Sequence, residues 1–255
     1  MRIRPLPRNI IAALWIWGTC ALAGHRVVSP GSQVTLRVKI QNESTKPGLS
    51  RQRSTDESEV VVWLRPVDAN ATEFSASAGE QPTKRPRVIQ KDKSFQPHLT
   101  VIRVGSVVEF PNHDPFFHNV FSLFNGKRFD LGLYEAGASN SVRFDHAGVS
   151  YIFCNIHPEM SAVVVTVDTP YYGVSDHSGT VTIGNVPEGK YEMHVWYERS
   201  LADALKTLTR TVNISTGSRE LGTVVVAQDP GFTPTHKNKY GQDYPTPPKQ
   251  GYPQP

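Results

Sequence analysis

Short runs of alternating apolar and polar residues, separated by turn residues, recur between residues 87 and 168 and constrain the fold more than any other feature. The runs are LTVIRV, SVVEF, HNVFSLF, SNSVRFD, VSYIFC and SAVVVTVD. Side chains of a β-strand point alternately to its two faces, so this alternation predicts half-buried strands. Because no segment of helical periodicity interrupts the runs, the sequence predicts an all-β sandwich or barrel over residues 87–168.

A second set of β segments lies on both sides of this region. QVTLRVKI (33–40) and VVVWLRP (60–66) precede it, and TVTIGNV, KYEMHVWYE, TRTVNIS and LGTVVVAQ follow within residues 169–228. The turn signals DHSG and PEG separate the first of these later strands, and LADALKT (201–207) could form one or two helical turns. The sequence therefore predicts a second small β-sandwich.

Two segments are predicted to lie outside the folded units. Residues 68–86 are rich in small residues, polar residues and proline, which is typical of a linker. The tail, residues 229–255, has proline at seven of its 27 positions and few apolar residues. We predict that it is disordered or polyproline-like. The N-terminal strands, within residues 24–67, either join the second sandwich or form an independent hairpin.

The first 23 residues have the pattern of a signal peptide. The basic segment MRIRPLPR precedes the apolar run NIIAALWIWGTCALA, and Ala21-Leu22-Ala23 fits a cleavage site. A run of this length is too short for a comfortable membrane span, and an uncleaved anchor is the alternative. We predict cleavage after Ala23, no transmembrane segment in the mature chain, and a periplasmic or secreted location. Cleavage after Gly24 would instead leave His25 at the amino terminus.

Cleavage changes the charge and the cysteine count. It removes three arginines and no acids, which leaves 24 of the 27 basic residues against 23 acidic ones. A nearly neutral chain gives no reason to expect a nucleic-acid partner. Cleavage also removes Cys20, so that Cys154 is the one cysteine of the mature chain. An unpaired thiol is a liability in an oxidising compartment unless something, such as a metal, occupies it.

The stretch CNIHPEM places three metal-binding side chains close together. Cys154 ends a predicted strand, and His157 and Met160 follow at intervals of three residues in a tight loop. His118 stands at the start of another predicted strand. Two histidines, one thiolate and a weak axial thioether are the ligands of a blue-copper electron-transfer site. The alternative is a tetrahedral zinc site formed by His113 with His118, Cys154 and His157.

Residues 87–168 resemble the cupredoxins, most closely the amicyanin and plastocyanin branch. The resemblance depends on GSVVEFPNHDPFFHNV, on FDHAGVSYIFCNIHPEM and on the following strand SAVVVTVD. It implies a Greek-key β-sandwich with one type 1 copper, held by His118, Cys154, His157 and Met160. It also implies that Asn119 supports the site, because its counterpart in cupredoxins ties the two ligand loops together by hydrogen bonds. Glu159 replaces an apolar residue often found there, which argues against the usual hydrophobic docking patch.

The segment VSDHSGTVTIGNVPEGKYEMHVWYE resembles transthyretin-like modules of the carboxypeptidase-regulatory type. Such modules begin with two strands that this chain lacks after Thr169. Our hypothesis is that residues 31–67 pair with residues 170–228, so that the cupredoxin-like unit is an insertion between them. Fold analogy gives this module no chemistry.

Three functions fit these observations. The first is an exported blue-copper protein that carries single electrons to an unidentified redox partner protein, with His157 as the electron exit. The second is a copper-storage or copper-delivery protein with the same ligands. The third is a structural surface module in which the metal is only a staple. The sequence contains no His-x-His pair of the multicopper oxidases and no nucleophile triad or phosphate-binding loop, so we predict no enzymatic activity.

Overall fold

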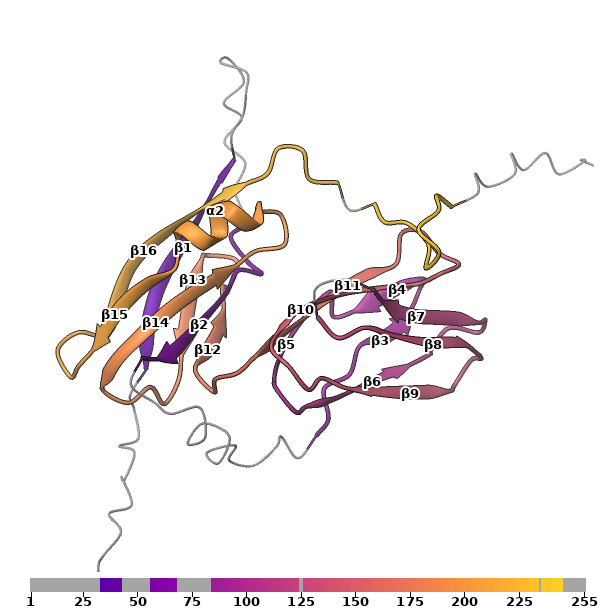
Figure 1. Cartoon of the computed structure of the whole chain (residues 1–255), viewed down its shortest axis with the longest axis horizontal. Helices are drawn as coiled ribbons and strands as arrows, with labels where there is room; N and C mark the ends of the chain where they lie inside the picture. The colour runs from indigo at the N-terminus through magenta and orange to yellow at the C-terminus, as the bar shows by residue number, and fades with distance from the viewer. Residues whose placement is uncertain (1–32, 43–55, 68–83, 124–125, 234, 245–255) are drawn as a thin grey trace, which may run out of the picture.

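The computed structural model describes residues 33–42, 56–67, 84–123, 126–233 and 235–244. The predicted signal peptide, residues 1–23, lies outside these ranges, as does most of the predicted linker. Within them the regular structure is β except for helix α2 (Ala202–Thr207), which falls in the LADALKT segment. No helix of the described ranges is long and apolar enough to cross a membrane. Figure 1 shows that the strands form two units that lie side by side.

The first β unit extends from β3 to β11 and contains the predicted metal ligands (Figure 1). Its largest sheet has the strand order β5-β11-β10-β7-β8, and the pairs β6-β9 and β3-β4 complete the unit. The strands are β3 (Ile89–Lys91), β4 (Ser94–Gln96), β5 (Leu99–Arg103), β6 (Val107–Pro111), β7 (His118–Ser122), β8 (Phe129–Tyr134), β9 (Ser139–Arg143), β10 (Gly148–Phe153) and β11 (Ser161–Val167). Each predicted run contains one strand. Strands β3 and β4, of three residues each, are too short to show an alternation, and β8 was not among the predicted runs.

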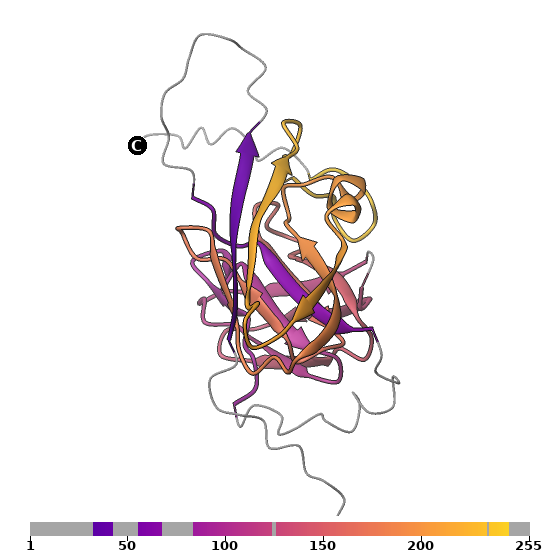
Figure 2. The ribbon, with the colours of Figure 1, turned by 90° about the vertical axis from the view of Figure 1, so that its left-hand side faces the viewer.

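The second β unit consists of two sheets, with the strand orders β13-β1-β16 and β12-β2-β14-β15 (Figures 1 and 2). Its strands are β1 (Val34–Asn42), β2 (Val61–Pro66), β12 (Tyr172–Val174), β13 (Thr180–Ile183), β14 (Gly189–Trp196), β15 (Arg210–Ile214) and β16 (Glu220–Gln228). Strand β1 pairs with β13 and β16, and β2 pairs with β12 and β14. The two N-terminal strands therefore share sheets with strands after Thr169, which is the pairing that the insertion hypothesis requires. The division of the chain into a domain of residues 87–168 and a module of residues 169–228 stays a prediction.

Strand β11 joins the two units. Its residues after Ser161 are all buried. Ala162 and Val164 pack in the core of the first unit, whereas the three valines that alternate with them belong to the core of the second unit, namely Val163, Val165 and Val167. A strand covered on both faces is apolar along most of its length, which explains the run AVVVTV. The two units therefore meet through an apolar interface.

The tail departs from the sequence prediction. Residues 229–255 are predicted to be disordered, yet residues 235–244 lie against the first unit and form hydrogen bonds with it (Figure 1). The prediction of disorder was based on the composition of the whole tail. Composition gives no information about single side chains that can pack against a folded unit. Here the ring of His236 stacks on Phe153, with 4.1 Å between ring centroids. Residues 245–255 lie outside the described ranges.

Candidate metal centre

Two strand ends bring the predicted ligands together. His118 is the first residue of β7, and Cys154 directly follows the last residue of β10. The two strands are antiparallel neighbours, so the start of β7 lies beside the end of β10. His157 then follows Cys154 in the loop that connects β10 with β11. The sheet thus juxtaposes residues that are far apart in the sequence.

The three side chains point their ligand atoms at one another. The Cys154 sulfur lies 3.8 Å from Nδ1 of His118 and 3.6 Å from Nδ1 of His157, and the two Nδ1 atoms are 3.1 Å apart. Among the histidine, cysteine and acidic side chains of the described residues, these three form the group whose ligand atoms converge. All of its ligand atoms lie within 4.8 Å of one another. His118 and Cys154 are fully buried, whereas His157 is partly exposed.

The separations suit a single metal ion. Bonds of roughly 2.0–2.1 Å to nitrogen and about 2.3 Å to sulfur place neighbouring donor atoms roughly 3–4 Å apart around one centre. One thiolate with two imidazoles is a donor set that copper accepts in both oxidation states. Burial, together with the nearby His118 and Lys93, lowers the pKa of His157 below its usual value. A lowered pKa favours the neutral imidazole, which is the form that binds metals.

The zinc alternative is not assembled in the described residues. His113 is exposed, and its ring is not part of the converging group. Its backbone N–H donates to the carbonyl of Gln90, in the turn before β7. Because the predicted tetrahedral set needs the His113 ring, that set does not form.

Met160 is buried at the end of the ligand loop. Its side chain is fully buried in the same core as Cys154. The backbone closes the loop, because the Cys154 N–H donates to the Met160 carbonyl at 3.3 Å and the Met160 N–H donates to the His157 carbonyl at 3.1 Å. The backbone thus ties Met160 to Cys154 and His157. A role for its sulfur as the axial ligand stays a prediction.

A buried carboxylate, which the sequence analysis missed, orients His118. Asp114 Oδ2 accepts a hydrogen bond of 2.7 Å from Nε2 of His118, and the two side chains are 5% and 0% exposed. Backbone N–H groups of Asp92 and Lys93 also donate to the Asp114 carboxylate. An ionised carboxylate only accepts, so the His118 proton must sit on Nε2 and the Nδ1 lone pair faces the cysteine. The sequence signal that could have indicated this pair is the spacing Asp-x-x-x-His in HDPFFH.

Asn119 has a different partner from the one that the resemblance implied. Its side-chain amide donates to Oδ1 of Asp130 at 2.7 Å, and no hydrogen bond joins it to the Cys154 loop in the described residues. Its Oδ1 atom is buried without a partner. Asp130 lies on β8, so Asn119 ties β7 to its sheet neighbour. Its supporting role at the site stays a prediction.

An apolar rim consists of three exposed residues that neighbour His118 or His157 in space or in sequence, namely Phe116, Phe117 and Ile156. The ring of Phe116 lies 5.2 Å from the His118 ring and 5.8 Å from the His157 ring, centroid to centroid. Phe116, Phe117 and Ile156 are 36%, 53% and 42% exposed. Glu159, in the same loop, is also exposed. Nζ of Lys93 lies 5.7 Å from the centroid of the Phe116 ring. The apolar rim is thus bordered by one acidic and one basic residue.

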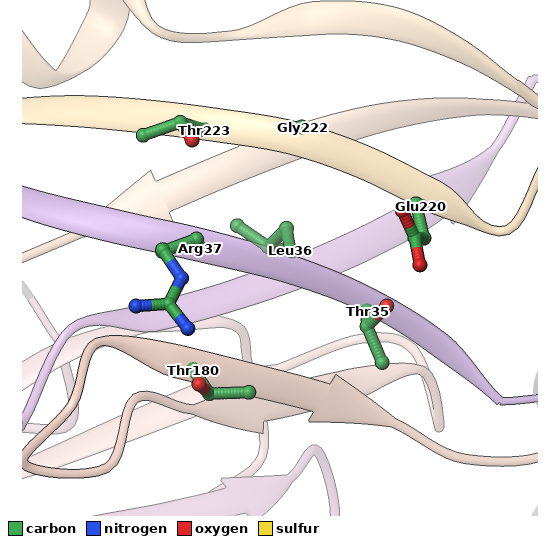
Figure 3. Close-up of a pocket in the computed structure, with 7 residues that line it drawn as sticks. All are labelled: Thr35, Leu36, Arg37, Thr180, Glu220, Gly222 and Thr223. Carbon is green, nitrogen blue, oxygen red and sulfur yellow. The ribbon is translucent and has the colours of Figure 1, made fainter.

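A separate hollow lies on the second unit and has no metal-binding character. It has a volume of about 330 Å³ and lies over β1, β13 and β16, and Figure 3 shows that threonines, Arg37 and Glu220 line it. None of its lining residues is a histidine or a cysteine.

Comparisons with known proteins find only partial structural matches. No protein-family model matches the chain, and no curated protein sequence matches it. Solved structures that resemble part of the chain include three copper proteins. A purple cupredoxin from Nitrosopumilus maritimus is 23% identical, with a TM-score of 0.30, and the match covers 32% of this chain and 99% of that one. Amicyanin from Paracoccus versutus is 20% identical, with a TM-score of 0.31, and the match covers 42% of this chain and 97% of that one.

The third structure is the copper-containing nitrite reductase from Thermus scotoductus, which is 23% identical, with a TM-score of 0.32. That match covers 40% of this chain and 25% of the reductase. Identities and scores this low carry no argument about function. The functional assignment therefore depends on the geometry of the site itself.

Proposed function

We propose that this chain is an exported type 1 copper protein that carries single electrons and catalyses no reaction of its own. The observation that carries the proposal is the convergence of the His118, Cys154 and His157 ligand atoms. Met160 is proposed as the fourth ligand, because it closes the same loop and is fully buried in the same core as Cys154. Export is proposed from the signal-peptide pattern of residues 1–23.

Copper, when bound, would supply a one-electron couple between Cu(I) and Cu(II). The chain's own residues hold the ligands in place. Asp114 keeps the His118 proton on Nε2, and the sheet fixes the distance between His118 and Cys154. A site with two fully buried ligands favours an electron carrier over a delivery protein, which needs an open and exchangeable site.

His157 is the proposed point of electron exit. It is the one partly exposed member of the converging group, and Phe116 of the apolar rim lies 5.8 Å from its ring, centroid to centroid. Small interfaces with an apolar centre suit brief encounters between redox proteins. The partner is proposed to be a redox protein that docks on this rim.

The test is the visible spectrum after addition of Cu(II). We expect an intense thiolate-to-copper charge-transfer band that disappears in Cys154→Ser and changes in Met160→Ala. Met193→Ala is the matched control, because Met193 is equally buried but belongs to the core of the second unit. Reversible one-electron reduction in voltammetry, with one copper per chain, completes the expected result.

Two outcomes would overturn the proposal. A colourless protein that binds Zn(II) with the same ligands would indicate a structural site. A copper protein that exchanges its metal rapidly with a chelator and shows no reversible electrode response would indicate storage or delivery.

A further inference from the structure

The C-terminal segment of residues 235–244, called the strap below, has a folded turn of its own. Asn238 organises it, because its side-chain oxygen accepts from the backbone N–H groups of Tyr240 and Gln242 at 2.9 and 3.0 Å. Gly241, at φ +77°, occupies the left-handed region and donates its N–H to the Asn238 carbonyl. A left-handed residue suits glycine, so the turn is encoded locally. The strap is therefore preorganised for contact with the first unit.

The strap holds the cysteine side of the metal centre. The Tyr244 hydroxyl donates to the Cys154 carbonyl at 2.6 Å, and the Lys239 backbone N–H donates to Oδ1 of Asn155 at 2.9 Å. Since the Cys154 N–H is bonded within the loop, the strap satisfies the other backbone polar group of this residue. His236 stacks on Phe153 with its ring 19° from parallel, and Tyr244 meets the His236 ring edge-on.

The strap also reaches the histidine side of the centre. Nζ of Lys239 lies 2.7 Å from Oδ2 of Asp130, whose Oδ1 accepts the hydrogen bond from Asn119. Asn119 directly follows His118 on β7. One short segment thus contacts the residues beside both ligand strands, β7 and β10.

We propose that the strap is a positioning element of the metal centre, which fixes the Cys154 loop by the hydrogen bond from Tyr244 and restricts access to the thiol. This inference extends the proposed function, since it assumes that Cys154 binds the metal. The effect acts through Cys154 and its neighbours; no strap residue is placed as a ligand. The strap lies outside the strands that form the unit, so removal of one of its contacts leaves the sheet intact.

The experiment measures the labelling rate of the Cys154 thiol in the metal-free full chain with a chromogenic aromatic disulfide. All variants carry Cys20→Ser, so that Cys154 is the one thiol. The test variants are Tyr244→Phe and His236→Ala. The matched control is Tyr240→Phe, which removes the same hydroxyl from a tyrosine that is 72% exposed. Circular dichroism and urea unfolding check that each variant is folded.

We expect Tyr244→Phe to raise the labelling rate about five- to tenfold, the factor that corresponds to the loss of one partly buried hydrogen bond. His236→Ala should raise it as well, and Tyr240→Phe should match the unmodified chain. In parallel, the Cu(II)-loaded Tyr244→Phe variant should release copper to a chelator faster by a similar factor, with a shifted charge-transfer band.

Equal labelling rates in all three variants would overturn the strap's role, as would an equal rise in Tyr240→Phe. If the unmodified chain binds no copper, the proposed function fails, yet the thiol rates of the metal-free chain still decide whether the strap holds the loop. The two failures are therefore distinguishable.

Discussion

Replacement of Asp114 by asparagine tests how the chain prepares His118 for metal binding. Asp114 Oδ2 accepts from Nε2 of His118 at 2.7 Å, in a place where both side chains are almost completely buried. Burial alone would raise the pKa of Asp114, but the backbone N–H of Lys93, the His118 ring and the backbone N–H of Asp92 together hold the pKa below its usual value. The group is therefore an ionised acceptor at neutral pH.

An asparagine replaces this charged acceptor by a weaker neutral one or changes the tautomer. If its NH2 group faces Nε2, two donors oppose each other unless the His118 proton moves to Nδ1, where it blocks the ligand atom. If its oxygen faces Nε2, the hydrogen bond to His118 loses its charge and the NH2 group opposes the Asp92 N–H. A hydrogen bond to a charged group contributes roughly 1.5–3 kcal/mol. Since about 1.4 kcal/mol corresponds to a factor of ten, copper affinity should fall about 10- to 100-fold, the range also typical for loss of a partner behind a metal ligand.

The assay is competition for copper between the protein and a chelator of known affinity. Asp145→Asn is the matched control, because Asp145 also contacts a histidine, His146 Nδ1 at 2.8 Å, but is exposed. We expect Asp114→Asn to lose affinity while Asp145→Asn keeps it. If Asp114→Asn bound copper within about twofold of the unmodified chain, the tautomer argument would be wrong.

Two further predictions concern stability. The hydrogen bond from His98 to Glu198 across the two units raises the pKa of His98, so its stabilisation is complete below the unfolded pKa of 6.5 and is lost as pH rises through the raised folded value. In urea unfolding, the free energy of unfolding of the unmodified chain should exceed that of Glu198→Gln at low pH, and this difference should shrink as pH rises. A difference that does not change with pH would contradict this. Gly179→Ala should cost more than about 2 kcal/mol, because Gly179 has φ +79° and its added Cβ would clash with the Val38 carbonyl. Gly184→Ala, where a Cβ meets no other atom within 4 Å, is the control in thermal unfolding, and equal costs would refute the steric argument.

Much of the β architecture could be predicted because the signals are local. Alternation over five or six residues marks most strands of the first unit, and turn residues mark their ends. Strand β8 was missed because Gly132, at φ +68°, interrupts a short and mostly half-buried run. The pairing of β1 with β13 and β16 was predicted only through the resemblance to a known type of module, since no local pattern records which strands become neighbours.

The candidate site also has features that could be predicted from the sequence and features that depend on the tertiary structure. The spacing of Cys154, His157 and Met160 is set within one loop, so the sequence alone identified them as candidate ligands. The implied partner of Asn119 was different in the structure, because hydrogen-bond partners depend on which strands lie beside β7. The role of Asp114 also escaped notice, since its burial beside His118 depends on the turn before β7.

The sequence by itself determined that this chain is rich in strands and that one loop carries a thiol, an imidazole and a thioether. Those properties follow from side-chain chemistry and from spacings of a few residues. The tertiary structure decided that β7 and β10 lie side by side, that β11 is buried between two units, and that residues 235–244 lie against the Cys154 loop. These are contacts between residues far apart in the chain, and their stability comes from the burial and hydrogen bonding of both partners together, which no single segment specifies.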